Sequence, residues 1–206
     1  MKLKSIFSLF SIVVLFQLSP LIFSSCIDDC SGQARYYRLS EFNGEAKEFV
    51  PTSPGWQSRP WSNTINLTTE KLLFWFIFGE ENLDKNDFIR RAHIGLPVLY
   101  ACDPGVNLEA GIEKIDLFAD KDFNSSFPAG TDLSEILLIA RVGGEVFVPL
   151  ESRKDSQRNV YNFTNFAVRF NQESEQSEAM KFTCNVTLQD GREFSSTIEN
   201  IILRVN

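Results

Sequence analysis

The sequence predicts an all-β domain, and its strand pattern favours a two-sheet sandwich of immunoglobulin-like kind. About nine short segments either alternate apolar and polar residues at period two or form brief apolar runs between turn residues. One segment has the signature of a helical turn, and no part of the chain has the spacing of a β-α-β unit. The alternatives to the sandwich are a barrel or an α+β fold.

The first half of the domain contains three strand signals and one loop signal. Residues 35–39 and 64–68 have the composition and alternation of half-buried strands. Residues 51–61 are dense in Pro, Gly and Trp, which predicts an irregular surface loop. Residues 72–78 are apolar on both parities and too short to span a membrane, so we expect a central strand covered on both faces.

Further along, residues 114–117 alternate and predict a strand, and residues 131–135 predict a single helical turn. Asp132 is expected as its N-cap, with Glu135 closing a capping box. A strand is also expected at residues 145–148.

The last third of the chain contains the clearest hairpin signal. Residues 166–170 predict a strand with Phe166, Val168 and Phe170 on one face and Ala167 and Arg169 on the other. Residues 182–188 alternate up to Asp190-Gly191, a pair typical of a two-residue type I′ turn, in which both residues have positive φ. The return starts at Phe194, and a last strand is expected over residues 198–205.

The N-terminus predicts export. Lys2 and Lys4 precede an apolar stretch over residues 6–23, and small residues follow, which is typical of a secretory signal over residues 1–25. The Phe23-Ser24-Ser25-Cys26 sequence resembles the lipobox of bacterial lipoproteins. The resemblance implies that Cys26 is the lipid-modified first residue of the mature protein, with a tether over residues 26–33 and the sandwich over residues 34–206.

Asp28 and Asp29 follow directly behind the lipid site. They resemble the acidic export signal that sends Bacteroidetes lipoproteins to the outer face of the outer membrane, which implies display on the cell surface. The alternatives are a solvated acidic tether and a position on the periplasm-facing leaflet of the outer membrane.

The charge of the mature chain excludes one class of partner. Of 20 basic and 27 acidic residues, the signal contains two lysines and no acid, so 18 basic residues face 27 acidic ones, a net charge of −9. Nucleic-acid binding requires clustered Lys and Arg, so we expect no nucleic-acid partner. The expected membrane contact is the lipid and not a basic patch.

Three internal stretches together resemble a lipoprotein domain of uncharacterised function found in Bacteroidetes. They are residues 99–102, residues 112–127 and residues 128–133, and the hairpin over residues 181–191 fits the same pattern. The resemblance covers most of the mature chain and implies the all-β fold and the envelope location. Its motifs are turns, a cap and core alternation, so it implies no catalytic residues.

The sequence gives little support for an enzyme. His93 is the single histidine of the chain and has no nucleophile motif near it, and the cysteines are not spaced for zinc. No pair of acids is singled out for glycosidase chemistry. We therefore predict no catalytic residues and a binding or assembly module for a protein or glycan partner; the alternatives are a carboxylate-based polysaccharide hydrolase and a purely structural spacer.

Two sets of side chains are candidate ligand sites. Asp120, Asp122 and Asn124 place oxygen donors at every second position of a loop, which suits calcium, although the loop lacks the Gly and Glu of an EF-hand. The alternative is a turn whose side chains bond to their own backbone. Trp56 and Trp61 flank the Pro-rich loop and are candidates for stacking against a sugar, whereas Trp75 is expected in the core.

With Cys26 lipidated, three cysteines remain in an oxidising compartment. Cys184 shares parity with core residues and is expected to be a buried free thiol. We predict a Cys30–Cys102 disulfide that ties the tether to the body of the domain. A Cys102–Cys184 bond is the alternative.

Overall fold

The computed structural model describes residues 35–62, 68–84, 106–141, 146–154, 160–161 and 163–205. The chain divides into two compact units, one formed by residues 1–36 and 83–107 and the other by residues 37–82 and 108–206. The second unit holds both sheets apart from the first two residues of β1 and of β4. No helix in the described ranges is long and apolar enough to span a membrane.

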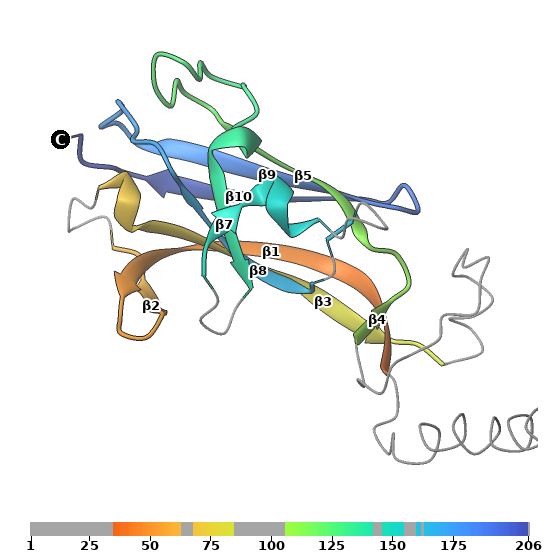
Figure 1. Cartoon of the computed structure of the whole chain (residues 1–206). Coiled ribbons are helices and arrows are strands. Elements are labelled where there is room, and N and C mark those ends of the chain that lie inside the picture. Colours follow the sequence, from red (N-terminus) through yellow and green to blue (C-terminus); the bar gives the residue numbers. More distant parts are fainter. Residues whose placement is uncertain are drawn as a thin grey trace, which may run out of the picture. The chain divides into compact units, whose positions relative to one another are not determined.

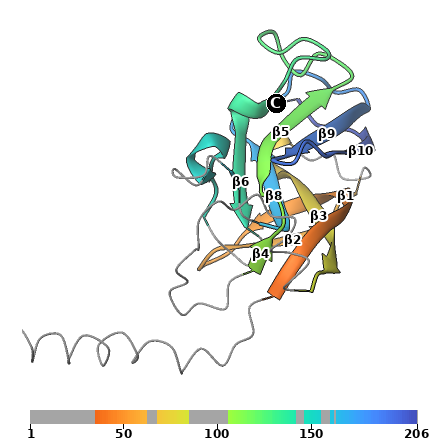
Figure 2. The same cartoon turned by 90° about the vertical axis from the view of Figure 1, so that its right-hand side faces the viewer.

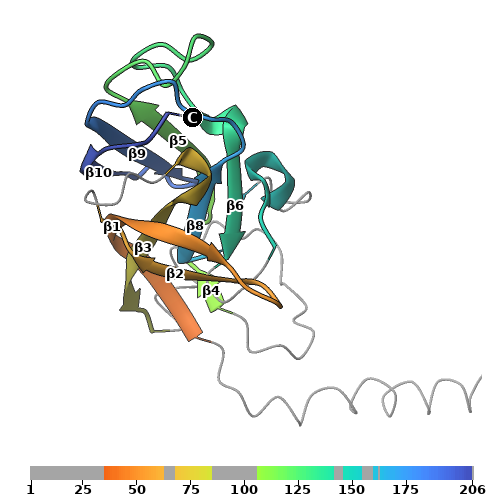
Figure 3. The same ribbon diagram turned by 90° about the vertical axis from the view of Figure 1, so that its left-hand side faces the viewer.

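The larger sheet has seven strands in the order β2-β1-β3-β8-β6-β7, with β4 as the seventh strand (Figure 1). Every neighbouring pair along this path is antiparallel. Figures 2 and 3 show β6 running beside β8 in both views. The strands are β1 (Arg35–Pro51), β2 (Trp56–Pro60), β3 (Leu72–Asn82), β4 (Val106–Leu108), β6 (Leu137–Arg141), β7 (Val148–Pro149) and β8 (Asn165–Phe170).

The smaller sheet has three antiparallel strands in the order β10-β9-β5. They are β5 (Ile112–Ala119), β9 (Met180–Leu188) and β10 (Glu193–Ile201). Three 3₁₀ turns complete the described elements: η1 (Thr69–Lys71), η2 (Ser134–Ile136) and η3 (Leu150–Arg153). The prediction of an all-β protein with two sheets is confirmed, and the immunoglobulin-like detail stays a prediction.

The core between the sheets is rich in phenylalanine because alternate residues of the facing strands are aromatic. Phe74 of β3 and Phe182 of β9 have ring centroids 4.9 Å apart, and Phe74 also meets Phe170 of β8 at 5.9 Å. Phe78 of β3 packs edge-on against Phe194 of β10 at 5.5 Å. These ring pairs join the two sheets through one hydrophobic core.

Close packing against the neighbouring strand explains why residue 44 of β1 is a glycine. Gly44 lies opposite Phe76 of β3 in the register. A Cβ at residue 44 would lie 2.5 Å from the Phe76 ring. Only a residue without a side chain lets this ring lie against β1.

The Pro-rich segment differs from the prediction. Residues 51–61 are not an irregular loop throughout, because β1 extends to Pro51 and pairs with β2 in a hairpin whose tip is residues 52–55. The prediction for β3 was also incomplete. Phe74, Phe76 and Phe78 are buried on the inner face, but on the outer face Ile77 is 43% exposed and Trp75 is half-buried.

The predicted type I′ turn at Asp190-Gly191 is wrong. Gly191 has a φ of +83°, but Asp190 does not have positive φ. The Gly191 N–H donates to the Leu188 carbonyl, and the Leu188 N–H donates to the Arg192 carbonyl. This is a type I turn followed by a left-handed glycine, the three-residue hairpin loop with a bulge.

The other local predictions were partly right. A helical turn follows Asp132, but it is the 3₁₀ turn η2, and its N-cap position is Leu133. The Asp132 carboxylate instead accepts the Ser134 N–H, and no bond from Glu135 closes a capping box. The return strand and the predicted last strand are one strand, β10, which ends at Ile201. Residues 64–67 of the strand predicted at residues 64–68 lie outside the described residues, as does residue 145 of the strand predicted at residues 145–148.

An ionic network joins β1 to the β9–β10 hairpin. Glu109, whose side chain is 9% exposed, accepts hydrogen bonds from Arg38 Nε at 2.8 Å and from Arg192 Nη2 at 3.3 Å. Arg192 also bonds to Asp190 at the turn and to the Leu39 carbonyl. The nearly buried carboxylate is thus compensated by two guanidinium groups.

Candidate functional site

The outer face of the seven-stranded sheet carries a group of aromatic rings and two cations, which we call the aromatic–cationic cluster. It lies on the opposite side of β1, β3 and β8 from the core. Its members are Lys47, Phe49, Trp56, Trp75, Phe147 and Arg169.

Strand alternation places these side chains on the outer face. In β3, Phe74 and Phe76 point into the core, so Trp75 between them points outward. In β8, Val168 and Phe170 are buried, so Arg169 points outward as well. The hairpin register then sets Trp56 opposite Pro51, and the Trp56 ring reaches Trp75 at 6.5 Å and Phe49 at 6.2 Å.

Phe147 links the two edges of the sheet across this face. It directly precedes β7, which is the edge strand opposite β2. Its ring nevertheless lies 5.2 Å from Trp56 of β2 and 5.7 Å from Phe49 of β1. The Phe147 ring therefore lies over the outer face and completes an aromatic frame with Phe49 and Trp56.

Arg169 lies within this frame. Its guanidinium carbon is 4.2 Å from the centre of the Phe49 ring and 5.8 Å from that of Phe147, and Nη2 donates to the Glu70 carbonyl at 3.0 Å. No carboxylate among the described residues lies within ion-pair distance of it. Burial lowers the pKa of the guanidinium, and the Glu70 charge raises it. An arginine guanidinium is not deprotonated in proteins, so the group keeps its positive charge.

Lys47 places the second cation over an aromatic ring. Its Nζ lies 4.6 Å from the centre of the Trp75 ring and 2.8 Å from the Glu45 carboxylate. Trp75 has a further feature: its indole Nε1 is buried without a hydrogen-bond partner, as is Nε of Arg169, within the described part of the chain. The cluster therefore contains two unsatisfied donors, which are uncommon in folded proteins.

Only one of the two predicted ligand-binding tryptophans lies in the cluster. Trp56 belongs to the cluster, but Trp61 packs against the core cluster. Trp75, which was expected in the core, is instead the ring that joins Trp56. Sequence reasoning missed Lys47, Phe49, Phe147 and Arg169 as site residues. The parity of β8 did place Arg169 away from the core, but parity cannot show which outward side chains meet across four strands.

The candidate calcium loop uses its oxygens within the fold. Asp120 accepts the Lys181 N–H at 2.7 Å, and Asp122 accepts the Ala129 N–H at 2.8 Å. Asn124 accepts the Ser126 and Phe127 N–H groups and donates to the Glu173 carbonyl. These bonds match the alternative interpretation, a turn held by its own side chains, and calcium binding stays a prediction.

The remaining predicted site residues lie outside the described ranges. They are Cys26, Asp28, Asp29, Cys30, His93 and Cys102. Cys184 is described, and it is a free thiol buried in the core, as expected. Burial raises the pKa of this thiol, and the charges of Asp116 and Asp132 raise it further.

Comparison with known proteins does not assign the chain to a family. No family model matches the sequence, and no curated protein matches it significantly. The resemblance to a Bacteroidetes lipoprotein domain therefore stays a prediction.

Proposed function

We propose that this protein is a lipid-anchored binding module of the outer membrane, displayed on the cell surface, that engages a protein or glycan partner through the aromatic–cationic cluster. The single observation that supports the binding role most is the framed Arg169 on the outer face of the sheet. Aromatic rings and arginine are the side chains most enriched where proteins bind their partners. The lipobox-like sequence at Cys26 and the acidic pair Asp28-Asp29 support the anchor and its display.

The anchor is tested by Cys26→Ser, with the double change of Asp28 and Asp29 to Ala as a separate variant. We expect Cys26→Ser to leave an unprocessed precursor without lipid label. We expect the Asp28/Asp29 variant to keep its lipid but to lose accessibility to protease added to intact cells. Normal processing of the first variant contradicts the anchor, and unchanged digestion of the second contradicts the export signal.

The binding role is tested by site-specific photo-crosslinking in the native membrane. Ser58 lies opposite Phe49 in the β1–β2 hairpin, so a crosslinker there is next to the cluster without replacing any of its members. Lys181, an exposed residue of β9 in the other sheet, is the matched control position. We expect a discrete crosslinked product from residue 58 and none from residue 181. No product from residue 58 contradicts a binding role for the cluster.

A further inference from the structure

The charge and hydrogen-bonding character of the cluster narrows the class of ligand. The full chain carries a net charge of −7, yet the cluster combines two cations with four aromatic rings. Glu45 partly neutralises Lys47, whereas Arg169 has no carboxylate within ion-pair distance among the described residues. The Glu70 carboxylate acts on Arg169 at longer range, so the group available to a ligand is a guanidinium without a direct ion pair.

The two unsatisfied donors also favour a ligand that carries hydrogen-bond acceptors. Nε1 of Trp75 and Nε of Arg169 are both hydrogen-bond donors, and both are buried without a partner within the described ranges. A ligand rich in acceptor oxygens satisfies such groups after a small side-chain shift, whereas a cationic or purely apolar ligand does not. A carboxylate matches the planar fork of a guanidinium and accepts two parallel hydrogen bonds from it, as a phosphate does.

The exposed surface is more suited to a sugar than to an apolar protein interface. The large hydrophobic side chains that are strongly exposed in the described ranges are Ile77, Val146 and Val205. Phe49, Trp56, Trp75 and Phe147 are all half-buried, so they offer ring edges and partial faces between polar groups. The core of a protein–protein interface is normally a continuous apolar patch. A pyranose has apolar C–H faces ringed by oxygens, which fits a surface of mixed character.

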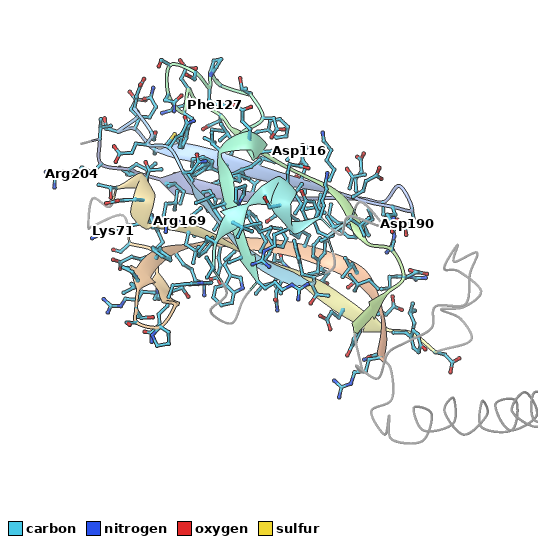
Figure 4. The ribbon with its side chains drawn as sticks, viewed as in Figure 1. Lys71, Asp116, Phe127, Arg169, Asp190 and Arg204 are labelled. Atoms are coloured by element: carbon cyan, nitrogen blue, oxygen red, sulfur yellow. The ribbon has the colours of Figure 1, made fainter. Side chains whose placement is uncertain are left out.

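We infer that the aromatic–cationic cluster binds a carboxylate-bearing polysaccharide, with Arg169 receiving the uronate carboxylate and Trp56 and Trp75 receiving the sugar faces. This inference rests on the proposed function and names its ligand class. Figure 4 shows Arg169 far from Asp190, which lies in the β9–β10 turn of the other sheet, so the Arg38–Glu109–Arg192 network that includes Asp190 is a separate structural feature.

The experiment is binding of the full-length protein, purified as its host processes it, to polygalacturonate, alginate and hyaluronate, with dextran as the neutral polymer. We expect binding to at least one acidic polymer and none to dextran, weakening as salt is added. Arg169→Met should lower the affinity about tenfold or more, the loss expected for a charge-assisted bond. Lys47→Met, which removes the other cation of the cluster, provides a second variant if Arg169→Met folds poorly.

Lys181→Met is the matched control, because it removes one positive charge from the other sheet. It should change the affinity by less than about twofold. Equal losses from Lys181→Met and Arg169→Met would show non-specific attraction and overturn the inference.

Equal binding of dextran and the acidic polymers overturns the carboxylate assignment but leaves a glycan-binding function. No polymer binding, together with a protein crosslinked from residue 58, overturns the inference and supports the protein-binding form of the proposed function. No polymer binding and no crosslink overturns both.

Discussion

The guanidinium carbon of Arg169 lies 4.2 Å from the centre of the Phe49 ring, although their strands are separated by β3 in the sheet. The arginine side chain therefore crosses the outer surface of a whole strand. Its Nη2 donates to the carbonyl of Glu70 in η1, which fixes the direction in which the side chain extends. The contact between Arg169 and Phe49 is the element from which the rest of the cluster is built.

This contact predicts a measurable coupling between the two side chains. We expect a double-mutant cycle of Arg169→Met and Phe49→Leu to give a coupling free energy of about 0.5–1 kcal/mol in unfolding, the range of a partly exposed cation–π pair. Arg169→Lys should not restore it fully, because an ammonium lacks the planar surface that stacks on the ring. Additive effects of the two substitutions in denaturant unfolding would contradict the contact.

The β9–β10 turn predicts a difference between two substitutions of the same glycine. Gly191 has a φ of +83° with no atoms within 4 Å of a built Cβ, so the cost of a side chain there is conformational and not steric crowding. Gly191→Ala should destabilise the fold by about 1–2 kcal/mol, and Gly191→Asn by less, because asparagine tolerates left-handed backbone. Equal stability of both variants and the wild type would show that the turn has a different conformation.

The Glu109 network predicts a large effect from a small change. Glu109→Gln keeps the side-chain size but removes the nearly buried charge that Arg38 and Arg192 share, so each guanidinium keeps only its exposed partner, Glu81 or Asp190. We expect a loss of about 2 kcal/mol in unfolding free energy. The matched control is Glu178→Gln, which breaks an exposed pair with Lys121 and should cause no measurable change. If the two variants are equally stable, the network contributes nothing.

The cysteines predict a defined pattern in peptide mapping of non-reduced protein. We expect a crosslinked peptide joining Cys30 and Cys102. Cys184 should resist alkylation near neutral pH and react after unfolding, because burial raises the pKa of its thiol and shields its sulfur.

The raised thiol pKa also sets a pH dependence for folding stability. Below the ordinary thiol pKa of about 8.5, the Cys184 thiol is protonated in both the folded and the unfolded chain. The contribution of the buried thiol to folding stability is then fully present. Above that pKa, the unfolded chain releases the proton first, so stability falls as pH rises towards the folded-state pKa. A crosslink between Cys102 and Cys184, or rapid alkylation of native Cys184, would contradict the assignment of Cys184 as a buried free thiol.

The parts of the fold that depend on local pattern could be predicted from the sequence. Alternation identified the β9 strand and placed Cys184 in the core, since residue parity alone decides which face a strand side chain occupies. The turn type was missed because Asp-Gly is compatible with two loop lengths, and the choice depends on the register of β9 against β10.

The candidate site could be predicted only in part. Trp56 was singled out by its Pro-rich surroundings, and Arg169 was placed on the outward parity of its strand. Their meeting depends on strand order, which brings residues 49 and 169 together, and on the position of Phe147, which lies just before β7 and reaches across to Phe49 and Trp56. Such contacts between distant segments carry no local signal in a single sequence.

Fluorescence quenching tests whether the cluster attracts anions: iodide and caesium are compared as quenchers of tryptophan fluorescence in a Trp61→Phe background, where Trp56 and Trp75 remain. Lys47 and Arg169 should attract the anion to these rings. We therefore expect iodide to quench more strongly than caesium despite the negative charge of the whole chain. The preference should shrink in the Lys47→Met and Arg169→Met variants and persist in Lys181→Met. Equal quenching by the two ions, or stronger quenching by caesium, would contradict an anion-binding surface at the cluster.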